Sequence, residues 1–470
     1  MCIAYGVKFM EWILNIAQIA EATGGEICNC NPDEIVQDVV RDSREVEDGV
    51  VFLALNGENN NGHKFVPTAI ENGAVCCVVN RDEGDFGKLP VIKVDDTFKA
   101  LMDIASYYRM QFDIPIVGIT GSVGKTSTKE MIACVLGEEF KTHKTEGNYN
   151  NEVGVPLTLL RLSKDDDISV IEMGMSNFGE ISRLTNAVKP DTAVITNIGV
   201  SHIENLGSRE GIRKAKFEIF EGLSVDGTVI LNGDDPYLWS ANGDIDYETL
   251  YYGIENKACD IVAKDIKTFS DSSEFTLRID GEEYRFEINA PGVHHIYNAL
   301  AAVLVGIKYN MSVENIVAGI KSFEPSGHRQ VIVETDKFTI IEDYYNASPD
   351  SMQSGLNVLS ITERGDGSRK VACLADMLEL GNISKQAHRQ VGHVVADSKA
   401  DCLIVIGNDA KYIAEGAVDN GFDPGNIYYF ENNDKAKAEL ENIVRDGDII
   451  LIKGSRGMRL EEIANYLENL

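Results

Sequence analysis

Residues that could bind a triphosphate lie close together in the sequence, between positions 114 and 136. The turn Gly121-Ser-Val-Gly124-Lys125-Thr126 follows the apolar segment 114–120, and a segment typical of a helix, 127–136, follows the turn. Glycines let backbone N–H groups face phosphate oxygens, and a helix N-terminus adds partial positive charge. A lysine here reaches the β- and γ-phosphates, and a threonine hydroxyl can bind Mg²⁺. We therefore expect a phosphate-binding loop, although Ile119 stands where the common G-x-x-x-x-G-K-[ST] motif has its first glycine.

Two further side chains could bind a metal ion beside this loop. Glu172 lies at the end of the apolar segment 168–173, and His202 follows the apolar segment 192–197. Ligands of a parallel sheet bind at the carboxyl ends of its strands, where a carboxylate suits Mg²⁺ and a histidine can be a ligand. We therefore expect a metal site formed by Thr126, Glu172 and His202. Lys216 lies in a segment with helical spacing, which by itself indicates a solvated helix face.

The elements that must position these residues alternate between strand and helix. Strands are predicted at 114–120, 168–173, 192–197 and 227–231, and this alternation indicates a parallel sheet with right-handed crossovers. A β-rich insert near 260–290 contains the hairpin turn Asp280-Gly281, and a helix follows at 297–309. Before the loop, helices are predicted at 10–22, 64–72 and 97–112, with strands at 50–55, 75–79 and 91–94. After Gly327, strands are predicted at 339–341, 371–374, 402–406, 427–430 and 448–452. The chain of 470 residues is thus expected to be an α/β protein of three domains, 1–96, 97–327 and 328–470.

Composition excludes several classes of protein. The net charge of −32 argues against binding nucleic acid or an anionic membrane surface, because both need clustered lysine and arginine. The longest apolar run, 299–307, is far shorter than the ~20 residues that span a bilayer. Apolar residues at the N-terminus are interrupted by Lys8 and Glu11, so they indicate a helix and not a signal peptide. Nine cysteines without a C-x-x-C motif indicate reduced thiols and a cytoplasmic protein.

Motifs in chain order resemble the Mur ligase family, whose members use ATP to join an amino acid or peptide to a nucleotide-sugar peptide in peptidoglycan synthesis. The resemblance covers nearly the whole chain and is carried by residues 120–126, 147–151, 172–174, 197–202, 215–216, 232–236, 292–302, 327–329, 343–352, 376–381 and 453–457. Asp376-Met-Leu-Glu-Leu-Gly381 and Tyr345-Asn-Ala-Ser-Pro349 resemble the member that adds D-alanyl-D-alanine to UDP-N-acetylmuramoyl-tripeptide. Ser348 and Ala375 replace the asparagine and glycine that are more usual in that family.

This resemblance implies a role for each part of the chain. It implies an N-terminal UDP-binding unit, a central ATPase and a Rossmann-like C-terminal unit, acting as a cytoplasmic monomer. The residues implied to bind ATP are Gly121, Ser122, Gly124, Lys125, Thr126, Ser127, Asn298 at the adenine, Arg329 at the γ-phosphate and Asp343 at the ribose. The implied catalytic residues are Lys125, Lys216 as a carbamate, Arg329 and His202, of which His202 joins Glu172 at Mg²⁺. The implied substrate residues are Ser43 and Arg44 at the uridine nucleotide, Asn148, and Asn346 and Asp376 toward the dipeptide.

The resemblance also implies a reaction in which a substrate carboxylate attacks the γ-phosphate of ATP. The acyl phosphate that forms would then be attacked by the neutral amine of the dipeptide. Two alternatives stay open. One is another ligase of the superfamily, acting on folate, cyanophycin or an earlier muramyl peptide, although the last domain has no Asp-Asn-Pro-Arg segment. The other is an ATP-driven switch or motor; a GTPase would need an Asn-Lys-x-Asp motif, which the chain lacks.

Overall fold

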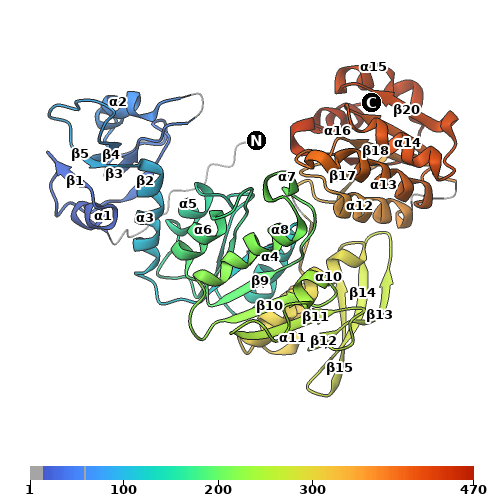
Figure 1. Ribbon diagram of the computed structural model, residues 1–470, viewed down its shortest axis with the longest axis horizontal. Helices are drawn as coiled ribbons and strands as arrows, with labels where there is room; N and C mark the ends of the chain where they lie inside the picture. Colours follow the sequence, from blue (N-terminus) through green and yellow to red (C-terminus); the bar gives the residue numbers. More distant parts are fainter. Residues whose placement is uncertain (1–13, 58–59, 326, 364, 366) are drawn as a thin grey trace.

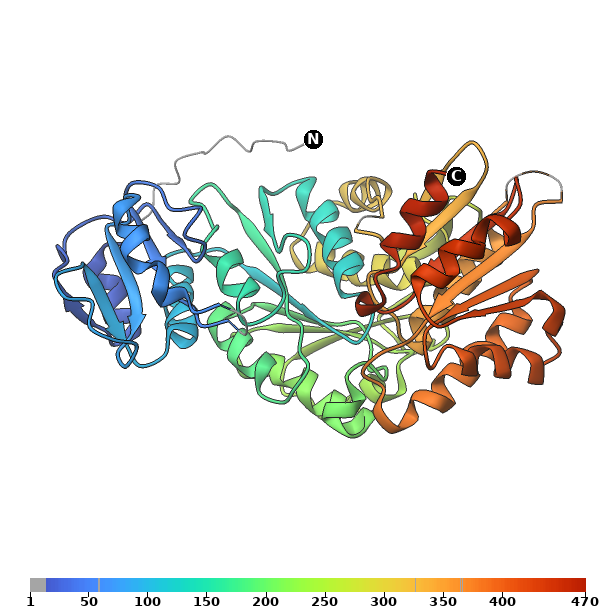
Figure 2. The ribbon, with the colours of Figure 1, turned by 90° about the horizontal axis from the view of Figure 1, so that it is seen from above.

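The computed structural model describes residues 14–57, 60–325, 327–363, 365 and 367–470. Three α/β units follow one another along the chain in an elongated row, with the N-terminal unit at one end and the C-terminal unit at the other (Figures 1 and 2). Each unit holds its own β-sheet, and a fourth, three-stranded sheet belongs to the middle of the chain. The predicted α/β class and the three-unit organisation are therefore confirmed.

The N-terminal sheet has the strand order β1-β5-β4-β3-β2, and only β1 is antiparallel to its neighbour. The strands are β1 (Glu26–Cys28), β2 (Asp38–Val40), β3 (Val50–Leu53), β4 (Cys76–Asn80) and β5 (Val91–Val94). Side chains alternate between the two faces, so that Val78 packs toward α1 (Ile16–Thr23) and α3 (Thr97–Arg109), while Val79 packs toward α2 (Val66–Glu71), which follows η1 (Gly62–Phe65). Helix α3 then leads into the central unit.

The central sheet consists of parallel strands in the order β12-β11-β10-β9-β6-β8-β7. The strands are β6 (Ile116–Thr120), β7 (Thr142–Lys144), β8 (Ile168–Glu172), β9 (Thr192–Ile195), β10 (Thr228–Asn232), β11 (Glu248–Gly253) and β12 (Ile261–Val262). One face packs on α4 (Lys125–Gly137), α10 (Val293–Lys308) and α11 (Val313–Lys321). The other packs on α3, α5 (Gly154–Leu159), α6 (Glu180–Val188), α8 (Arg209–Phe217) and η2 (Glu218–Glu221). The short helices α7 (Ile203–Leu206) and α9 (Pro236–Trp239) complete this unit. Because β6 lies between β9 and β8, the carboxyl ends of these three strands are neighbours.

The β-rich insert forms an antiparallel sheet of β13 (Lys264–Thr268), β14 (Ser273–Ile279) and β15 (Glu282–Ile288). Asp280 and Gly281 connect β14 and β15 with φ angles of 51° and 91°, as the predicted hairpin turn requires. The stacked rings of Phe275 and Phe286, whose centroids are 5.0 Å apart, belong to the same hydrophobic core as α10 and α11. The insert therefore packs as part of the central unit.

The C-terminal sheet has the order β16-β17-β21-β18-β19-β20, and only β16 is antiparallel. The strands are β16 (Val331–Glu334), β17 (Thr339–Asp343), β18 (Lys370–Ala375), β19 (Cys402–Ile406), β20 (Ile427–Phe430) and β21 (Ile449–Lys453). One face packs on α12 (Pro349–Ile361), α13 (Ser384–Asp397) and α14 (Lys411–Asp419), and the other on α15 (Asn433–Ile443) and α16 (Glu461–Glu468). Three single turns, η3 (Gly381–Ile383), η4 (Pro424–Asn426) and η5 (Arg456–Met458), lie in the loops.

The bounds of some predicted helices differ from those observed. Helix α1 begins at Ile16, because the side chain of Asn15 accepts a hydrogen bond from the backbone N–H of Gln18 and caps the helix; residues 10–13 of the predicted helix lie outside the described residues. The helix predicted over 64–72 divides into η1 and α2. Within the described part of the chain, no helix is long and apolar enough to cross a membrane.

Candidate functional site

The phosphate loop connects β6 to α4. Gly124 lies in the left-handed region, with φ at 82°, and precedes α4 without any side-chain cap. The first turn of α4 therefore presents N–H groups that an anion can accept. A Cβ atom on Gly121 would lie 1.9 Å from Oγ1 of Thr196, so the turn passes β9 too closely for any larger residue. The predicted strand, turn and helix are all found, and Ser122 and Ser127 lie in the loop and in the first turn of α4.

Lys125 lies inside the turn. Its Nζ atom donates hydrogen bonds to the carbonyl oxygens of Gly121 at 2.9 Å and Ser122 at 3.5 Å. Loss of hydration lowers the pKa of Lys125; the charge of Glu172 opposes this shift, and that of Arg329 adds to it. Two residues that the sequence predicts at the phosphates, Lys125 and Arg329, are thus close enough to influence each other, although they belong to different units.

Thr126 and Glu172 meet beside the loop. The Thr126 hydroxyl donates to Oε2 of Glu172 at 2.8 Å, and the side-chain amide of Asn150 donates to Oε1 at 2.7 Å. Glu172 is 1% exposed. A buried carboxylate beside a threonine hydroxyl is an oxygen donor set of the type that Mg²⁺ prefers. The structure therefore brings together two of the three residues predicted to bind metal.

His202 follows the neighbouring strand β9 by seven residues, at the start of α7, and contacts the C-terminal unit. Its Nδ1 atom is 2.6 Å from Oε2 of Glu379, and this contact holds the pKa of the Glu379 carboxyl below its usual range. Both residues have positive φ angles, 61° for His202 and 63° for Glu379. Among the described residues, no three His, Cys, Asp or Glu side chains converge on one point where a metal ion could be held by protein groups alone.

Lys216 is buried, contrary to what a generic helix lysine would show. It lies on α8 and is 2% exposed, and its side chain makes no hydrogen bond within the described residues. Burial holds its pKa well below the usual range, and the positive charge of Lys125 lowers it further. Burial thus favours the neutral amine of this lysine over its charged form.

The residues predicted to bind the nucleoside lie where the central and C-terminal units meet. The Thr128 hydroxyl donates to Oδ1 of the buried Asn298 at 3.0 Å, and this oxygen faces Gly124. The Arg329 guanidinium lies over the ring of Tyr345, 3.8 Å from its centroid. Asp343 is buried in an ion pair with Lys453, whose Nζ is 2.8 Å from Oδ2. Burial raises the pKa of Asp343, and Lys453 opposes that shift.

Two histidines near this boundary carry polar atoms without a partner. His294 and His295 begin α10 with their ring centroids 4.2 Å apart. Nε2 of His294 and both ring nitrogens of His295 are buried and make no hydrogen bond in the described structure. Burial lowers the pKa of His294 to about 4, so these rings are neutral and could donate to or accept from a nucleoside.

The predicted substrate residues are spread over the molecule. Ser43 and Arg44 follow β2, and the exposed Arg44 side chain is paired with Asp42. Asn148 lines a pocket of about 260 Å³ that also contains Arg41 and Asn151, so this pocket lies between the N-terminal and central units. Ser43 and Arg44 thus belong to the N-terminal unit, whereas Asn148 lies in the segment that also carries Asn150, the donor to Glu172.

The two residues predicted on the dipeptide side differ in exposure. Asn346 is exposed, whereas Asp376 is buried. The Asp376 carboxylate accepts hydrogen bonds from the backbone N–H groups of Asn408, Asp409 and Ala410 at 2.9, 2.9 and 2.6 Å. This carboxylate thus holds the loop after β19, and in this conformation its oxygens are engaged by the protein.

Several residues of the site were not assigned a role from the sequence. Asn197 accepts hydrogen bonds from the backbone N–H groups of Ser122 and Val123 at 3.2 and 3.0 Å, and thereby fixes the loop. Asn150 orients Glu172, and Lys453 pairs with Asp343. Their occurrence in the motifs at 147–151, 197–202 and 453–457 was the only available signal. Lys129, which is fully buried on α4, gave none.

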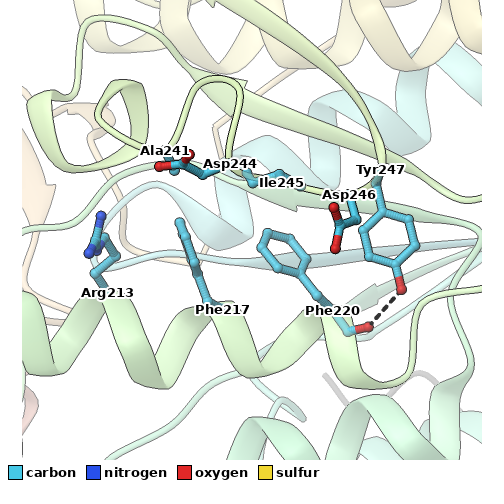
Figure 3. A pocket seen from close by; sticks show the side chains of 8 residues that line it. All are labelled: Arg213, Phe217, Phe220, Ala241, Asp244, Ile245, Asp246 and Tyr247. Atoms are coloured by element: carbon cyan, nitrogen blue, oxygen red, sulfur yellow. Dashed lines mark hydrogen bonds between the residues drawn. The ribbon is translucent and has the colours of Figure 1, made fainter.

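A further pocket lies beside α8. It encloses about 350 Å³ between α8, η2 and the segment 241–247. Figure 3 shows Arg213, Phe217 and Phe220 rising from the helix toward Asp244, Asp246 and Tyr247. None of the predicted site residues lines it, although Phe217 is adjacent to Lys216 in the chain.

Comparison with family models covers all three units. Residues 36–109 match the model described as Mur ligase family, catalytic domain. Residues 119–306 match the Mur ligase middle domain, and residues 328–456 match the Mur ligase, glutamate ligase domain. The matched ranges correspond to the three units seen in the structure.

Full-length relatives and solved structures are also similar to this chain. A UDP-N-acetylmuramoyl-tripeptide--D-alanyl-D-alanine ligase of Bacillus subtilis is 39% identical over 96% of this chain and 98% of its own length. A crystal structure of MurF from Acinetobacter baumannii has a TM-score of 0.88 at 29% identity, covering 97% of this chain and 98% of that one. A structure of MurF ligase from Thermotoga maritima in complex with ADP has a TM-score of 0.81 at 28% identity, covering 92% and 97%.

Proposed function

This chain belongs to the Mur ligase family, and we propose that it joins D-alanyl-D-alanine to UDP-N-acetylmuramoyl-tripeptide while ATP is converted to ADP and phosphate. The observation that carries the proposal is the arrangement around β6. The phosphate loop after this strand is flanked by Glu172 at the end of β8 and by His202 after β9, and the charge of Arg329 acts on Lys125 in the loop. The similarity to D-alanyl-D-alanine ligases over almost the full length supports the choice of substrates.

ATP would bind with its phosphates in the turn 121–127 and its nucleoside toward the C-terminal unit. The uncapped first turn of α4 supplies N–H donors, and Lys125 can leave the carbonyl groups of Gly121 and Ser122 to meet the β- and γ-phosphates. Arg329 would neutralise the γ-phosphate from the opposite side. The unpartnered nitrogens of His294 and His295 suit the adenosine, together with Asn298 and Asp343.

Mg²⁺ fits the oxygen donors beside the loop. Mg²⁺ sites commonly use one or two carboxylates together with substrate phosphates, which agrees with Thr126 and Glu172 forming only part of a coordination shell. The ion would reduce the repulsion between the substrate carboxylate and the triphosphate. We propose His202 as a further ligand, which would have to exchange its contact with Glu379 for the metal.

Lys216 is proposed to act as a carbamate. Carbamylation joins the neutral amine to carbon dioxide, releases one proton to solvent and leaves an anion where a buried cation would be unfavourable. The support is its burial and its lowered pKa beside Lys125. An anion here would compensate Lys125 and partner the metal.

Binding of the nucleotide-sugar peptide and binding of the dipeptide would be divided between the units. Ser43, Arg44 and Asn148 would hold the nucleotide-sugar peptide along the boundary between the first two units, with Arg41 and Asn151 in the same pocket. The acyl phosphate would form at the loop, and the dipeptide amine would approach from the C-terminal unit near Asn346 and the loop that starts at Asp376. Because water destroys acyl phosphates, closure of the units around the site is expected.

We propose domain boundaries at residues 96 and 327. Strand β5 ends at Val94, and the C-terminal sheet starts at Val331. Gly327, His328 and Gln330 all have positive φ angles, of 66°, 54° and 57°, which makes this junction a candidate hinge. We also propose a cytoplasmic location, since the enzyme would consume ATP and the described cysteines are free thiols.

A phosphate-release assay tests the function directly. Purified protein with ATP and Mg²⁺ should release phosphate only when both UDP-N-acetylmuramoyl-tripeptide and D-alanyl-D-alanine are present, and the ligated product should be detected by mass spectrometry. Equal turnover with a UDP-muramyl dipeptide and a single amino acid would assign the chain to an earlier step. Phosphate release without any acceptor would favour an ATP-driven switch.

A further inference from the structure

Lys129 is a fully buried charge that the proposed reaction does not use. It lies on α4, one turn after Lys125, and its side chain is 0% exposed. Burying an ammonium group is costly unless it is paired and hydrogen-bonded, so its partners indicate what it does.

The hydrogen-bond partners of Lys129 lie on the segment that begins at Thr145, which contacts Glu172. Nζ of Lys129 donates to the carbonyl oxygen of Thr145 at 2.6 Å and to that of Gly147 at 3.4 Å. Its charge is balanced by Glu130, whose Oε1 is 2.8 Å away. Lys129 and Lys144 together hold the pKa of Glu130 below its usual range against the effect of burial. The ammonium group therefore attaches the phosphate helix to the segment 145–150.

The same segment orients Glu172 at two points. The Thr145 hydroxyl accepts a hydrogen bond from the backbone N–H of Glu172 at 3.0 Å. Asn150 donates to Oε1 of the Glu172 carboxylate at 2.7 Å. Thr145 is fully buried, so this connection is shielded from water. A shift of Thr145 would move both the strand end and the carboxylate that faces Thr126.

We propose that Lys129 is a positioning residue, which sets the orientation of Glu172 for the metal ion through Thr145 and Asn150. This inference rests on the proposed role of Glu172 in metal binding. Residues that orient metal ligands typically affect metal affinity or activity by about 10- to 100-fold when they are removed. Lys129 would act without touching the metal, the nucleotide or either peptide.

The variant Lys129→Met tests the proposal, because methionine keeps the length of the chain and removes the charge and the donors. Lys144→Met is the matched control, since it removes the other cationic partner of Glu130 and leaves the hydrogen bonds to Thr145 and Gly147 intact. Binding of Mn²⁺ to the enzyme–ADP complex is measured by electron paramagnetic resonance, and the Mg²⁺ concentration for half-maximal turnover is measured in parallel. Circular dichroism confirms that each variant is folded.

In Lys129→Met, we expect the dissociation constant for Mn²⁺ and the Mg²⁺ requirement to rise about 10-fold or more, with the KM for the nucleotide-sugar peptide nearly unchanged. Lys144→Met should stay within about twofold of the unmodified enzyme, in line with the small contribution of partly exposed ion pairs. If Lys129→Met does not fold, Lys129→Gln, which keeps a donor, should show the same effect on Mn²⁺ to a lesser degree.

Glu172→Gln distinguishes failure of this inference from failure of the proposed function. If Glu172→Gln weakens Mn²⁺ binding and neither Lys129 variant does, Lys129 is only structural and the inference is overturned. If Glu172→Gln leaves Mn²⁺ binding unchanged, the proposed metal site itself is wrong.

Discussion

The buried ion pair between Asp343 and Lys453 leads to a prediction about stability. These residues are cross-strand neighbours at the carboxyl ends of β17 and β21, with side-chain exposures of 9% and 1%. Lys453 also donates to the carbonyl oxygens of Asp343 and Asn346, both at 3.3 Å. Substituting Lys453→Met leaves the Asp343 carboxylate buried without its partner, and breaking a buried pair in this way costs about 3–5 kcal/mol.

The cost should depend on pH, with a sign that follows from burial. Burial already raises the pKa of Asp343 above 3.8, and Lys453 opposes that shift. In Lys453→Met the pKa must therefore rise further. A carboxyl whose folded pKa is raised is stabilising in its protonated form, and that stability is lost as the pH rises through the folded value. The destabilisation by Lys453→Met should thus be largest at neutral pH and should shrink as the pH falls toward the ordinary value of an aspartic acid.

Hydrogen exchange followed by mass spectrometry measures this locally, which matters because a three-unit chain does not unfold in one step. In peptides that contain 339–343 and 449–453, protection should fall by about two to three orders of magnitude, at about 1.4 kcal/mol for each tenfold change. Peptides of the N-terminal sheet serve as the internal reference. The variant Lys453→Met/Asp343→Asn should recover most of the protection. Equal loss of protection in the single and double variants, or a loss that grows on acidification, would refute this reasoning.

Three further outcomes are expected. Gly121→Ala should reduce kcat by about 100-fold or more, because its Cβ would lie 1.9 Å from Thr196 Oγ1. Adding Thr196→Ala should restore part of the activity measured by phosphate release, and no recovery would show that this contact is not the cause of the loss. Lys216→Ala should lose at least about 10- to 100-fold in turnover and regain some of it with added short carboxylic acids, whereas a lysine without a carbamate role would show no response to acid. Iodoacetamide at neutral pH should modify Cys30 before Cys77 and Cys373, and peptide mass spectrometry reports the order. The reason is that a hydrogen bond from Cys76 lowers the pKa of Cys30, while burial raises the pKa of the other two thiols to about 12. The variant Cys76→Ala should therefore slow the reaction of Cys30.

Much of the fold could be predicted because the buried strands are continuous apolar runs. The strands at 91–94, 402–406 and 427–430 have the predicted bounds. The strands that were missed are mainly short and lie at sheet edges, such as β1, β2, β7 and β16. Strand β7, Thr142–Lys144, is partly exposed and polar, so its sequence lacks an apolar signal, whereas β2 and β16 are mostly apolar but only three and four residues long. Such a segment becomes a strand by pairing with its neighbour and not through its local sequence.

The part of the candidate site that lies at the carboxyl edge of the central sheet could be predicted from the sequence. Thr126, Glu172 and His202 follow from strand ends, because parallel strands place their carboxyl ends together. The contacts of His202 with Glu379 and of Asp343 with Lys453 join residues more than a hundred positions apart, and the first of these depends on how two units pack. Lys129 could not be recognised because a buried lysine and an exposed one have the same local sequence pattern.

The distribution of charge explains how an acidic chain can act on anionic substrates. The chain carries a net charge of −32, yet Lys125, Lys129, Lys216, Arg329 and Lys453 gather around one strand end and one domain boundary. Two of these cations have protein partners of opposite charge, Lys129 with Glu130 and Lys453 with Asp343. The positive charge of Lys125 instead lowers the pKa of Lys216, while the charge of Glu172 favours the charged form of Lys125. If the triphosphate binds at the loop as we propose, its charge would compensate Lys125 and Arg329, which an acidic chain does not do on its own.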